Sequence, residues 1–495
     1  MKKKMAILAM FAMTCCGSSA PSGPSLTIYN QNFAVVRELI SLNLIKGIND
    51  VSFSGVTAQL EPDSVVLRDP SGNKPILILE QNYRSEPISE ALLLSYYEGK
   101  TIEFSTDSGI ITGKIIKSGH VPIGRPRQGG GYYNYAKSPG FPSESSNLPL
   151  VEVDGKFRFG LPGAPIFPSL PDDVLLKPTL QWLLVSDKAG AIDAELSYVS
   201  SGMSWEADYN LVSEQRSDLM DLVGWVTIQN WSGKEFKDAN IKLMAGDVSK
   251  LQKRDEVMEY KSHVISGDDN TFQVTEKEFD DYHLYTLPRL VTLHDSEMKQ
   301  VEFIRVSGIK SKRFYVYNGV DLSHDSIYGL DRRNDKSYGA KSNTKVWAMR
   351  EFNNSKENHL GLPLPKGKMR FYIRDDDGSL QFVGENEIDH SPKDELVRVY
   401  TGNAFDIVGE RTQTNFRGGG RPADWVEEQF EIKVKNHKKE KVEVRVVEHL
   451  SRCFNWEIKN NSHPYLKTDV QNIEFRLQIK PEDEQKITYT ARYTW

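Results

Sequence analysis

Three carboxylates alternate in the C-terminal half of the chain: Glu385, Glu387 and Asp389, followed directly by His390. Because successive side chains of a β-strand point to opposite faces, all three would lie on one face of a strand. Like charges on one face repel each other unless a cation offsets them, and Ca²⁺ takes several oxygen ligands. The pattern is compatible with a cation site or with a hydrolase that uses Glu385 and Asp389. It lacks the spacing of a calcium loop, so a solvated strand face is the simpler interpretation.

The cysteines and histidines offer little further chemistry. Cys453 is the only cysteine beyond residue 20, so it has no intramolecular disulfide partner, and it lacks zinc-site spacing. We expect a buried apolar thiol, although nearby His449 leaves a nucleophile hypothesis open. The ten histidines show no metal-ligand spacing, and no phosphate-loop, dinucleotide or serine-hydrolase motif occurs. We therefore predict no catalytic residue, metal or cofactor, while noting that a glycosidase needs only two carboxylates that the fold brings together.

Two further motifs have ordinary structural interpretations. Trp205, Ala207 and Tyr209 share one face of a predicted strand. We expect this face to pack in a core rather than to form a platform for stacking sugars. Residues 230–232 have the form of a glycosylation acceptor, which we attribute to chance in a chain with a bacterial type of leader.

The N-terminus has the layout of a secretory signal. Lysines at 2–4 precede an apolar run at 5–13, which is too short to span a bilayer. Two cleavage sites remain open. Cleavage before Cys16 resembles a lipoprotein signal and would make Cys16 the lipidated residue, whereas ordinary cleavage near Ala20 would meet Pro21. A lipid on Cys16 would be the protein's contact with a membrane.

Length and charge limit the class of protein. The chain has 495 residues, enough for two to four domains, and 39% hydrophobic with 26% charged residues is typical of a soluble globular protein. Its net charge is −6, and removal of residues 1–20 takes away three lysines and no acid, which gives −9. No basic stripe is present, so we exclude nucleic acid as a partner.

Apolar and polar residues alternate at every second position wherever the pattern is clear, which is typical of β-strands. The apolar spacing within 86–97 instead predicts a short helix. The Asp154-Gly155 pair predicts a hairpin with a type I′ turn over 151–159. We expect strands at 26–28, 33–53 with a turn at 46–50, 101–104, 110–116, 181–185, 191–199, 205–211, 224–230, 240–245, 430–434, 442–446, 473–479 and 487–495, with a further β segment beginning at Tyr282.

The fold class that follows is all-β, with tandem antiparallel β domains. We expect a C-terminal immunoglobulin-like β-sandwich and, because a helix accompanies short strands near residue 100, a small N-terminal barrel-like β domain. The predicted division is a signal segment at 1–20, an N-terminal β domain at 24–185, a central β-rich domain at 186–380 and a C-terminal β-sandwich at 381–495.

Two segments interrupt the β pattern. Residues 122–149 are rich in Gly, Pro and Ser, and we predict a long loop there, decorative in the simpler interpretation. Its Arg125, Arg127 and tyrosines are candidate contacts for a glycan or a protein. Residues 248–275 are charged and weakly periodic, and we expect a helical or irregular insertion.

A family resemblance rests on several separated runs. Residues 196–209 read LSYVSSGMSWEADY, and further blocks follow at 224–230, 243–248, 282–288, 360–365, 374–395 and 409–411. Together they resemble a bacterial envelope family known as domain of unknown function 4139, over about residues 170–495. The resemblance implies a secreted or periplasmic β-rich protein, and it implies no catalytic residues. The loop at 122–149 lies outside it.

The function we expect is that of a non-enzymatic exported protein of the periplasm or cell envelope. Its β domains would bind an envelope protein or a glycan, or serve a structural role, and a lipid on Cys16 would anchor it. The alternative is a carbohydrate-active or metal-assisted hydrolase that uses paired carboxylates.

Overall fold

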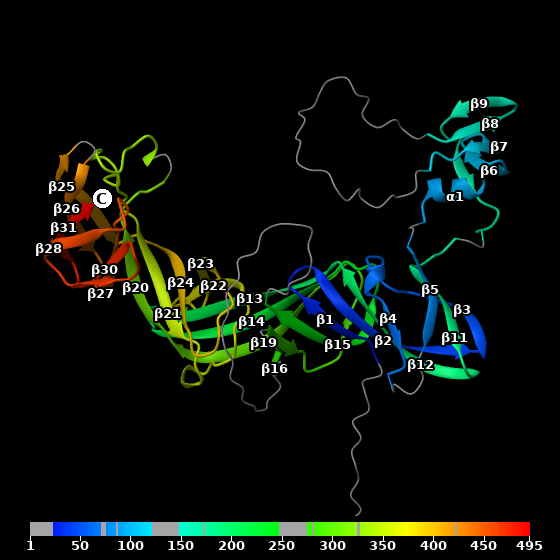
Figure 1. Cartoon of the computed structure of the whole chain (residues 1–495), viewed down its shortest axis with the longest axis horizontal. Coiled ribbons are helices and arrows are strands. Elements are labelled where there is room, and N and C mark those ends of the chain that lie inside the picture. Colours follow the sequence, from blue (N-terminus) through cyan, green and yellow to red (C-terminus); the bar gives the residue numbers. More distant parts are fainter. Residues whose placement is uncertain are drawn as a thin grey trace, which may run out of the picture.

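The computed structural model is an elongated chain of β-sheets (Figure 1). A small inserted domain lies at one end and a C-terminal sandwich at the other, with a larger sandwich between them. The all-β class is confirmed, since helix among the described residues is confined to α1, two short 3₁₀ turns, Pro62–Ser64 and Lys356–Asn358, and the single residue Ile327. The structure describes residues 23–70, 76–85, 88–120, 148–171, 174–246, 275–279 (backbone), 282–323, 327–420 and 423–495.

The first sandwich is built from three sheets around one large hydrophobic core. Apolar residues at alternate positions of its strands face inward, among them Leu26, Trp182 and Tyr209. The first sheet has the order β16 (Thr275–Phe279), β17 (Tyr282–Thr286), β15 (Phe236–Ala245), β1 (Ser25–Tyr29), β2 (Phe33–Leu44), β12 (Gly190–Ser201) and β4 (Val66–Arg68), and β18 (Val291–Leu293) also pairs with β15. The second sheet has the order β3 (Gly47–Ser54), β11 (Thr179–Ser186) and β5 (Leu77–Arg84). The third sheet has the order β19 (Glu297–Lys310), β14 (Leu219–Asn230), β13 (Met203–Glu214), β22 (Gly367–Arg374) and β23 (Leu380–Ile388).

The inserted domain lies between β5 and β11 and has a separate small core. The predicted helix is α1 (Glu90–Tyr96), whose Leu92 N–H donates to the Ser89 hydroxyl at 3.1 Å, an N-cap. The predicted type I′ hairpin is confirmed, since Asp154 and Gly155 both have positive φ, at 49° and 72°. The sheet runs in the order β10 (Ala164–Ile166), β6 (Thr101–Thr106), β7 (Gly109–Lys117), β8 (Leu150–Val153) and β9 (Lys156–Phe159).

This inserted sheet corrects the expectation of a barrel-like domain. Among the described strands, β10 and β9 are the two edges and do not pair with each other, so the sheet stays open. A barrel requires the first and last strands to hydrogen-bond. Periodicity in the sequence reports strands but not this closure.

The C-terminal sandwich packs two sheets on a second core. One sheet has the order β24 (Leu396–Ala404), β21 (Val346–Asn353), β20 (Lys312–Asn318), β27 (Val442–His449), β30 (Asn472–Ile479) and β29 (Tyr465–Lys467); the other has the order β25 (Ile407–Gly420), β26 (Ala423–Asn436), β31 (Asp483–Thr494) and β28 (Trp456–Asn461). The first of these sheets also reaches the larger sandwich. Phe352 and Val397 belong to the core of the larger sandwich, whereas Val346 belongs to the C-terminal core.

The two sandwiches repeat one strand arrangement. In the first, β1 pairs in parallel with β15 and antiparallel with β2, and β2 pairs with β12. In the second, β20 pairs in parallel with β27 and antiparallel with β21, and β21 pairs with β24. In the facing sheets, β14 lies between β13 and β19, as β26 lies between β25 and β31. The chain therefore contains two copies of one sandwich, and the parallel pairs mean that the sheets are mixed rather than purely antiparallel.

An asparagine at the same place in each copy supports this equivalence. Asn230 ends β14 and Asn436 ends β26. Each side-chain oxygen accepts from the backbone N–H two residues later, and each side-chain nitrogen donates to the carbonyl four residues later and to a carbonyl three residues before the last strand. Those carbonyls belong to Lys234 and His294 in the first copy and to Glu440 and Lys480 in the second.

Several predictions fall outside the described residues. They are the signal segment 1–20 with Cys16, nearly all of the loop 122–149 and nearly all of the insertion 248–275. Within the described part of the chain, no helix combines the length and the apolar character that crossing a bilayer requires. The domain borders that we drew from the sequence stay predictions.

Candidate functional site

The alternating carboxylates lie on the exposed face of β23 and just beyond its end, and each contacts a basic side chain. Arg370 Nε lies 3.5 Å from Glu385, and Lys366 Nζ lies 3.4 Å from Glu387 and 3.6 Å from Asp389. Hydrogen bonding to Glu387 and the charges of Glu387 and Asp389 raise the pKa of Lys366. Among the residues described, no group of three or more His, Cys, Asp or Glu side chains could hold a metal ion. The three carboxylates are thus exposed on the strand and paired with basic side chains.

The neighbouring acidic run at 375–377 makes the hairpin turn between β22 and β23. The Gly378 N–H donates to the Asp375 carbonyl at 2.9 Å, and Gly378 has a φ of 84° that favours glycine. Hydrogen bonds from Ser379 hold the pKa of Asp377 below its usual value. The acids of this run are therefore engaged in turn formation.

Cys453 and His449 have different partners. Cys453 is half-buried rather than fully buried, and its Sγ donates to the Asn455 carbonyl at 3.1 Å. The His449 Nε2 lies 3.1 Å from Asn318 Oδ1. A cysteine nucleophile needs its base within hydrogen-bond reach, so these contacts give no support to a Cys–His pair.

The aromatic face of β13 is core, as predicted. Trp205 and Tyr209 are 4% and 0% exposed, and their polar atoms donate to backbone carbonyls of Met244 at 3.1 Å and Pro365 at 2.6 Å. Asn230, in the acceptor-like motif, is fully buried with its amide in use. None of these three side chains is exposed on the folded surface, where it could contact or carry a glycan.

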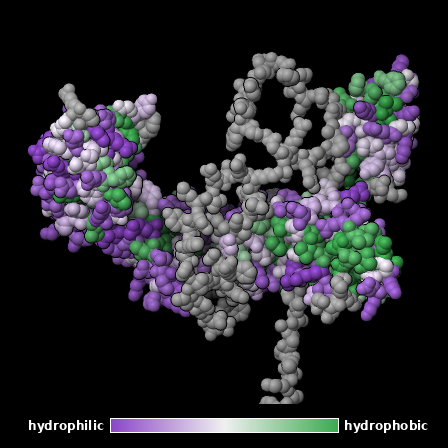
Figure 2. Space-filling view, viewed as in Figure 1, coloured by the Kyte–Doolittle hydropathy of each residue, from purple (hydrophilic) through white to green (hydrophobic). Residues whose placement is uncertain are grey.

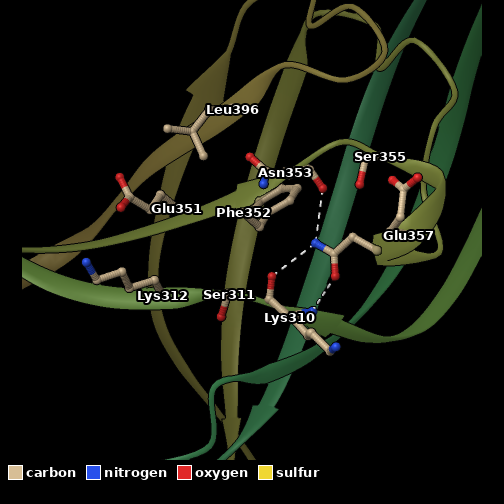
Figure 3. A pocket seen from close by; sticks show the side chains of 10 residues that line it. Lys310, Ser311, Lys312, Glu351, Phe352, Asn353, Ser355, Glu357 and Leu396 are labelled. Atoms are coloured by element: carbon tan, nitrogen blue, oxygen red, sulfur yellow. Dashed lines mark hydrogen bonds between the residues drawn. The ribbon is translucent and has the colours of Figure 1, made fainter.

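A cavity of about 460 Å³ opens where β19 passes into β20 (Figure 3). Asn358 extends into the connection, with Nδ2 donating to the carbonyls of Lys310 and Asn353 at 3.0 Å each. Glu351 on its wall is held by Arg445 at 2.6 Å. Hydrogen bonds from the Glu357 backbone amide and from Ser355 lower the pKa of the Glu357 carboxyl. Asn358 and Glu351 thus use their polar groups in contacts that join the elements around the cavity.

The C-terminal sandwich buries an ionic network between its sheets. Arg411 and Glu448 are 2% and 0% exposed and lie 2.9 Å apart, and the Tyr489 hydroxyl donates to the same carboxylate. Burial lowers the pKa of Arg411, but the charges of and hydrogen bonds to Glu448 and Tyr489 together outweigh burial and raise this pKa overall. The Arg411 guanidinium also stacks on the Phe430 ring at 3.8 Å. Burying a charge is costly, and pairing of this kind offsets the cost.

A second buried pair continues this network to the surface loop. Arg452 lies 2.8 Å from Glu428, and it donates to the carbonyls of Asp335 and Tyr338 at 2.9 and 3.0 Å. The network therefore holds the segment between β20 and β21 onto the end of the sandwich. Apart from Arg452 Nε, which has no hydrogen-bond partner among the described residues, the polar atoms named here bind other protein groups, which fits a structural role.

Exposed hydrophobic residues gather at the N-terminal end of the molecule. Figure 2 shows them on the inserted domain and on the end formed by β3, β11 and β5. On β3 and β5 they include Ile48 and Leu77, which are 61% and 56% exposed. Exposed apolar patches are found at interaction sites more often than on the rest of a protein surface.

The edge strand β9 carries the most exposed aromatic pair of the inserted domain. Phe157 and Phe159 are 66% and 73% exposed and share one face of the sheet with Ile110, while Lys156 and Arg158 point to the other face. Among the described strands, β9 pairs only with β8. An open strand edge next to exposed phenylalanines is therefore the clearest candidate for a binding surface, and the sequence predicted the hairpin without revealing that β9 is an edge.

A family model described as Domain of unknown function (DUF4139) matches residues 194–495. The chain belongs to the DUF4139 family. The resemblance found in the sequence is thereby confirmed, and no protein with a curated description matches the chain. The DUF4139 match begins within β12, so the first sandwich takes β1 and β2 from outside the family region. The inserted domain also lies outside the DUF4139 region.

Proposed function

We propose that this DUF4139 protein is a non-enzymatic, exported envelope protein that binds another protein through the inserted domain. The N-terminal layout of lysines, an apolar run and Cys16 supports export to the periplasm or cell envelope, with a lipid on Cys16 as the membrane anchor. The two-copy sandwich would then be a scaffold that carries the binding domain.

The observation that carries the proposal is the open edge of β9. An edge strand offers unpaired N–H and C=O groups that an extended segment of a partner can satisfy by adding a strand. Phe157 and Phe159 would supply apolar contact on one face of the added strand. Lys156 and Arg158 favour an acidic segment on the other face.

The paired carboxylates give the hydrolase alternative no positive support. Glu385 and Asp389 each contact a basic side chain, and Asp389 is 94% exposed. A general acid instead needs a carboxyl shielded from water in a site that holds substrate. Robust turnover of envelope glycans by the purified protein would nevertheless remove the proposal.

Cross-linking in intact cells tests the partner. The tagged full chain with its own leader is compared with a Phe157→Ser, Phe159→Ser double variant and with Phe454→Ser, a control at a phenylalanine that is 76% exposed elsewhere. We expect one protein to be captured by the wild type and the control and lost in the double variant. The captured segment, made as a peptide, should slow amide exchange in β9. Capture of a glycan, or equal capture by all three forms, would contradict strand addition.

A further inference from the structure

A groove with an unusual charge lies where the larger sandwich meets the C-terminal one. It measures about 340 Å³, within the range of small-molecule sites. One wall is apolar, with Leu211, Met220 and Phe371 from the larger sandwich. The other wall carries Arg313 from β20 and Arg350 from β21.

The two arginines are direct cross-strand neighbours. Arg313 pairs in register with Arg350 in the antiparallel β20–β21 ladder, so both side chains leave the same face. Like charges directly opposite each other destabilise a sheet. Arg313 has a distant carboxylate partner, Glu440 at 3.8 Å. The arrangement therefore concentrates positive charge on the groove wall.

Arg350 differs from the other buried arginines. It is 6% exposed, and its guanidinium donates only to neutral oxygens, namely the hydroxyls of Ser311 and Ser213 at 2.9 and 3.3 Å and the Ser217 carbonyl at 3.3 Å. Burial, followed by the charge of Arg313, lowers the pKa of Arg350, and the opposing charge of Asp218, which makes no ion pair with it in the described part of the chain, does not offset this.

The comparison with the other buried arginines is direct. Arg411, Arg445 and Arg452 each have a carboxylate within 2.9 Å. Among the residues that the structure describes, Arg350 has no carboxylate within ion-pair distance. A buried cation without a counter-charge is costly, and a cavity beside it is a place for an anion.

We propose that this groove binds a small organic oxyanion. Its carboxylate or phosphate group would lie between Arg313 and Arg350, where charge-assisted hydrogen bonds are strong. Its apolar part would lie against Leu211, Met220 and Phe371. Lys438 and Asp406 also line the groove, so three cationic side chains face one carboxylate there. This site is distinct from the β9 surface, and it stands whether or not that surface binds a protein.

Titration of the purified full chain with two probes tests the site. Sodium benzoate represents a carboxylate with an apolar body and sodium phosphate represents the phosphate group, each compared with sodium chloride at equal ionic strength. Melting temperature and isothermal titration calorimetry are recorded for the wild type, Arg350→Gln and Arg313→Gln. Arg305→Gln is the matched control, because Arg305 is an exposed arginine on β19 paired with Glu302 at 2.6 Å.

The expected result is that at least one probe raises the melting temperature beyond sodium chloride, and that the apparent affinity falls about tenfold or more in both groove variants but not in the control. The probe that acts identifies the anionic group. If Arg350→Gln does not fold, Arg313→Gln alone decides. No effect of either probe on the wild type, or equal binding by the groove variants, would overturn the proposal and leave Arg350 as a brace for the turn at Ser217.

Discussion

At the scale of single residues, the side chains that look chemically active are held in structural contacts. Glu385 and Asp389 contact basic neighbours on an exposed strand face. The most strongly held charges, Arg411 and Glu448, lie in the interior of the C-terminal sandwich. Their position between sheets was not predictable, because the alternation of a strand does not tell which polar residue on it faces inward with a partner from a distant strand.

Removing one member of the buried Arg411–Glu448 pair should strongly destabilise the protein. Glu448→Gln leaves Arg411 buried without a counter-charge, and we expect the free energy of unfolding to fall by about 3–5 kcal/mol. Glu387→Gln, at an exposed ion pair, should leave the unfolding midpoint unchanged within error. Guanidinium unfolding of both variants measures this. Similar midpoints for the two would show that the buried network contributes little.

A third carboxylate predicts a pH dependence. Burial raises the pKa of Glu351, but the hydrogen bonds and charges of Arg445 and Arg398 together outweigh burial and lower this pKa below 4.5. Because the folded-state pKa is depressed, the pair stabilises the protein above the unfolded-state pKa, and this contribution is lost as pH falls through the folded-state pKa. The stability difference between wild type and Glu351→Gln should therefore shrink on acidification below about pH 4.5. A difference that stays constant down to about pH 3 would contradict the assignment.

At the scale of secondary-structure elements, the local sequence pattern predicted individual strands, the helix and the turn, but it did not predict which distant strands pair. The alternation of β26 and β31, the helix at α1 and the Asp154-Gly155 turn all follow from short-range rules, and the structure has them. The open edge at β9 and the groove at Arg350 depend on which distant strands pair. That information lies in tertiary packing, so neither surface was predicted. The sequence did not predict the two copies of the sandwich either, because insertions separate their equivalent strands along the chain.

The equivalent asparagines give a prediction about elements. Asn230→Ala and Asn436→Ala should each lower the free energy of unfolding by about 1–3 kcal/mol, because each leaves buried carbonyls without a donor. Asn460→Ala, at an exposed position of β28, is the control. Urea unfolding compares the three. A large loss at one corner and none at the other would argue against equivalent roles in two copies.

At the scale of the whole molecule, the cores of the two sandwiches are linked by a common sheet, but the core of the inserted domain is separate. The two sandwiches share the β21–β24 sheet, whereas the inserted domain has its own core around Phe104. Phe104 is fully buried, and Phe104→Ala should cost about 3–5 kcal/mol, a large share of the stability of a small domain. Hydrogen exchange should then speed up in β6, β7 and β8 but not in β26. Equal acceleration in β26 would show that the inserted domain does not fold as a separate unit.

The most direct test of the proposed function is a photo-cross-linking amino acid at position 157 of the full chain in intact cells. The control places the same group at position 454, which is also exposed and lies between β27 and β28 of the C-terminal sandwich, at the other end of the molecule from the inserted domain (Figure 1). If β9 binds a protein partner, position 157 gives one discrete adduct and position 454 gives none. No adduct at 157, or the same products from both positions, would contradict the account.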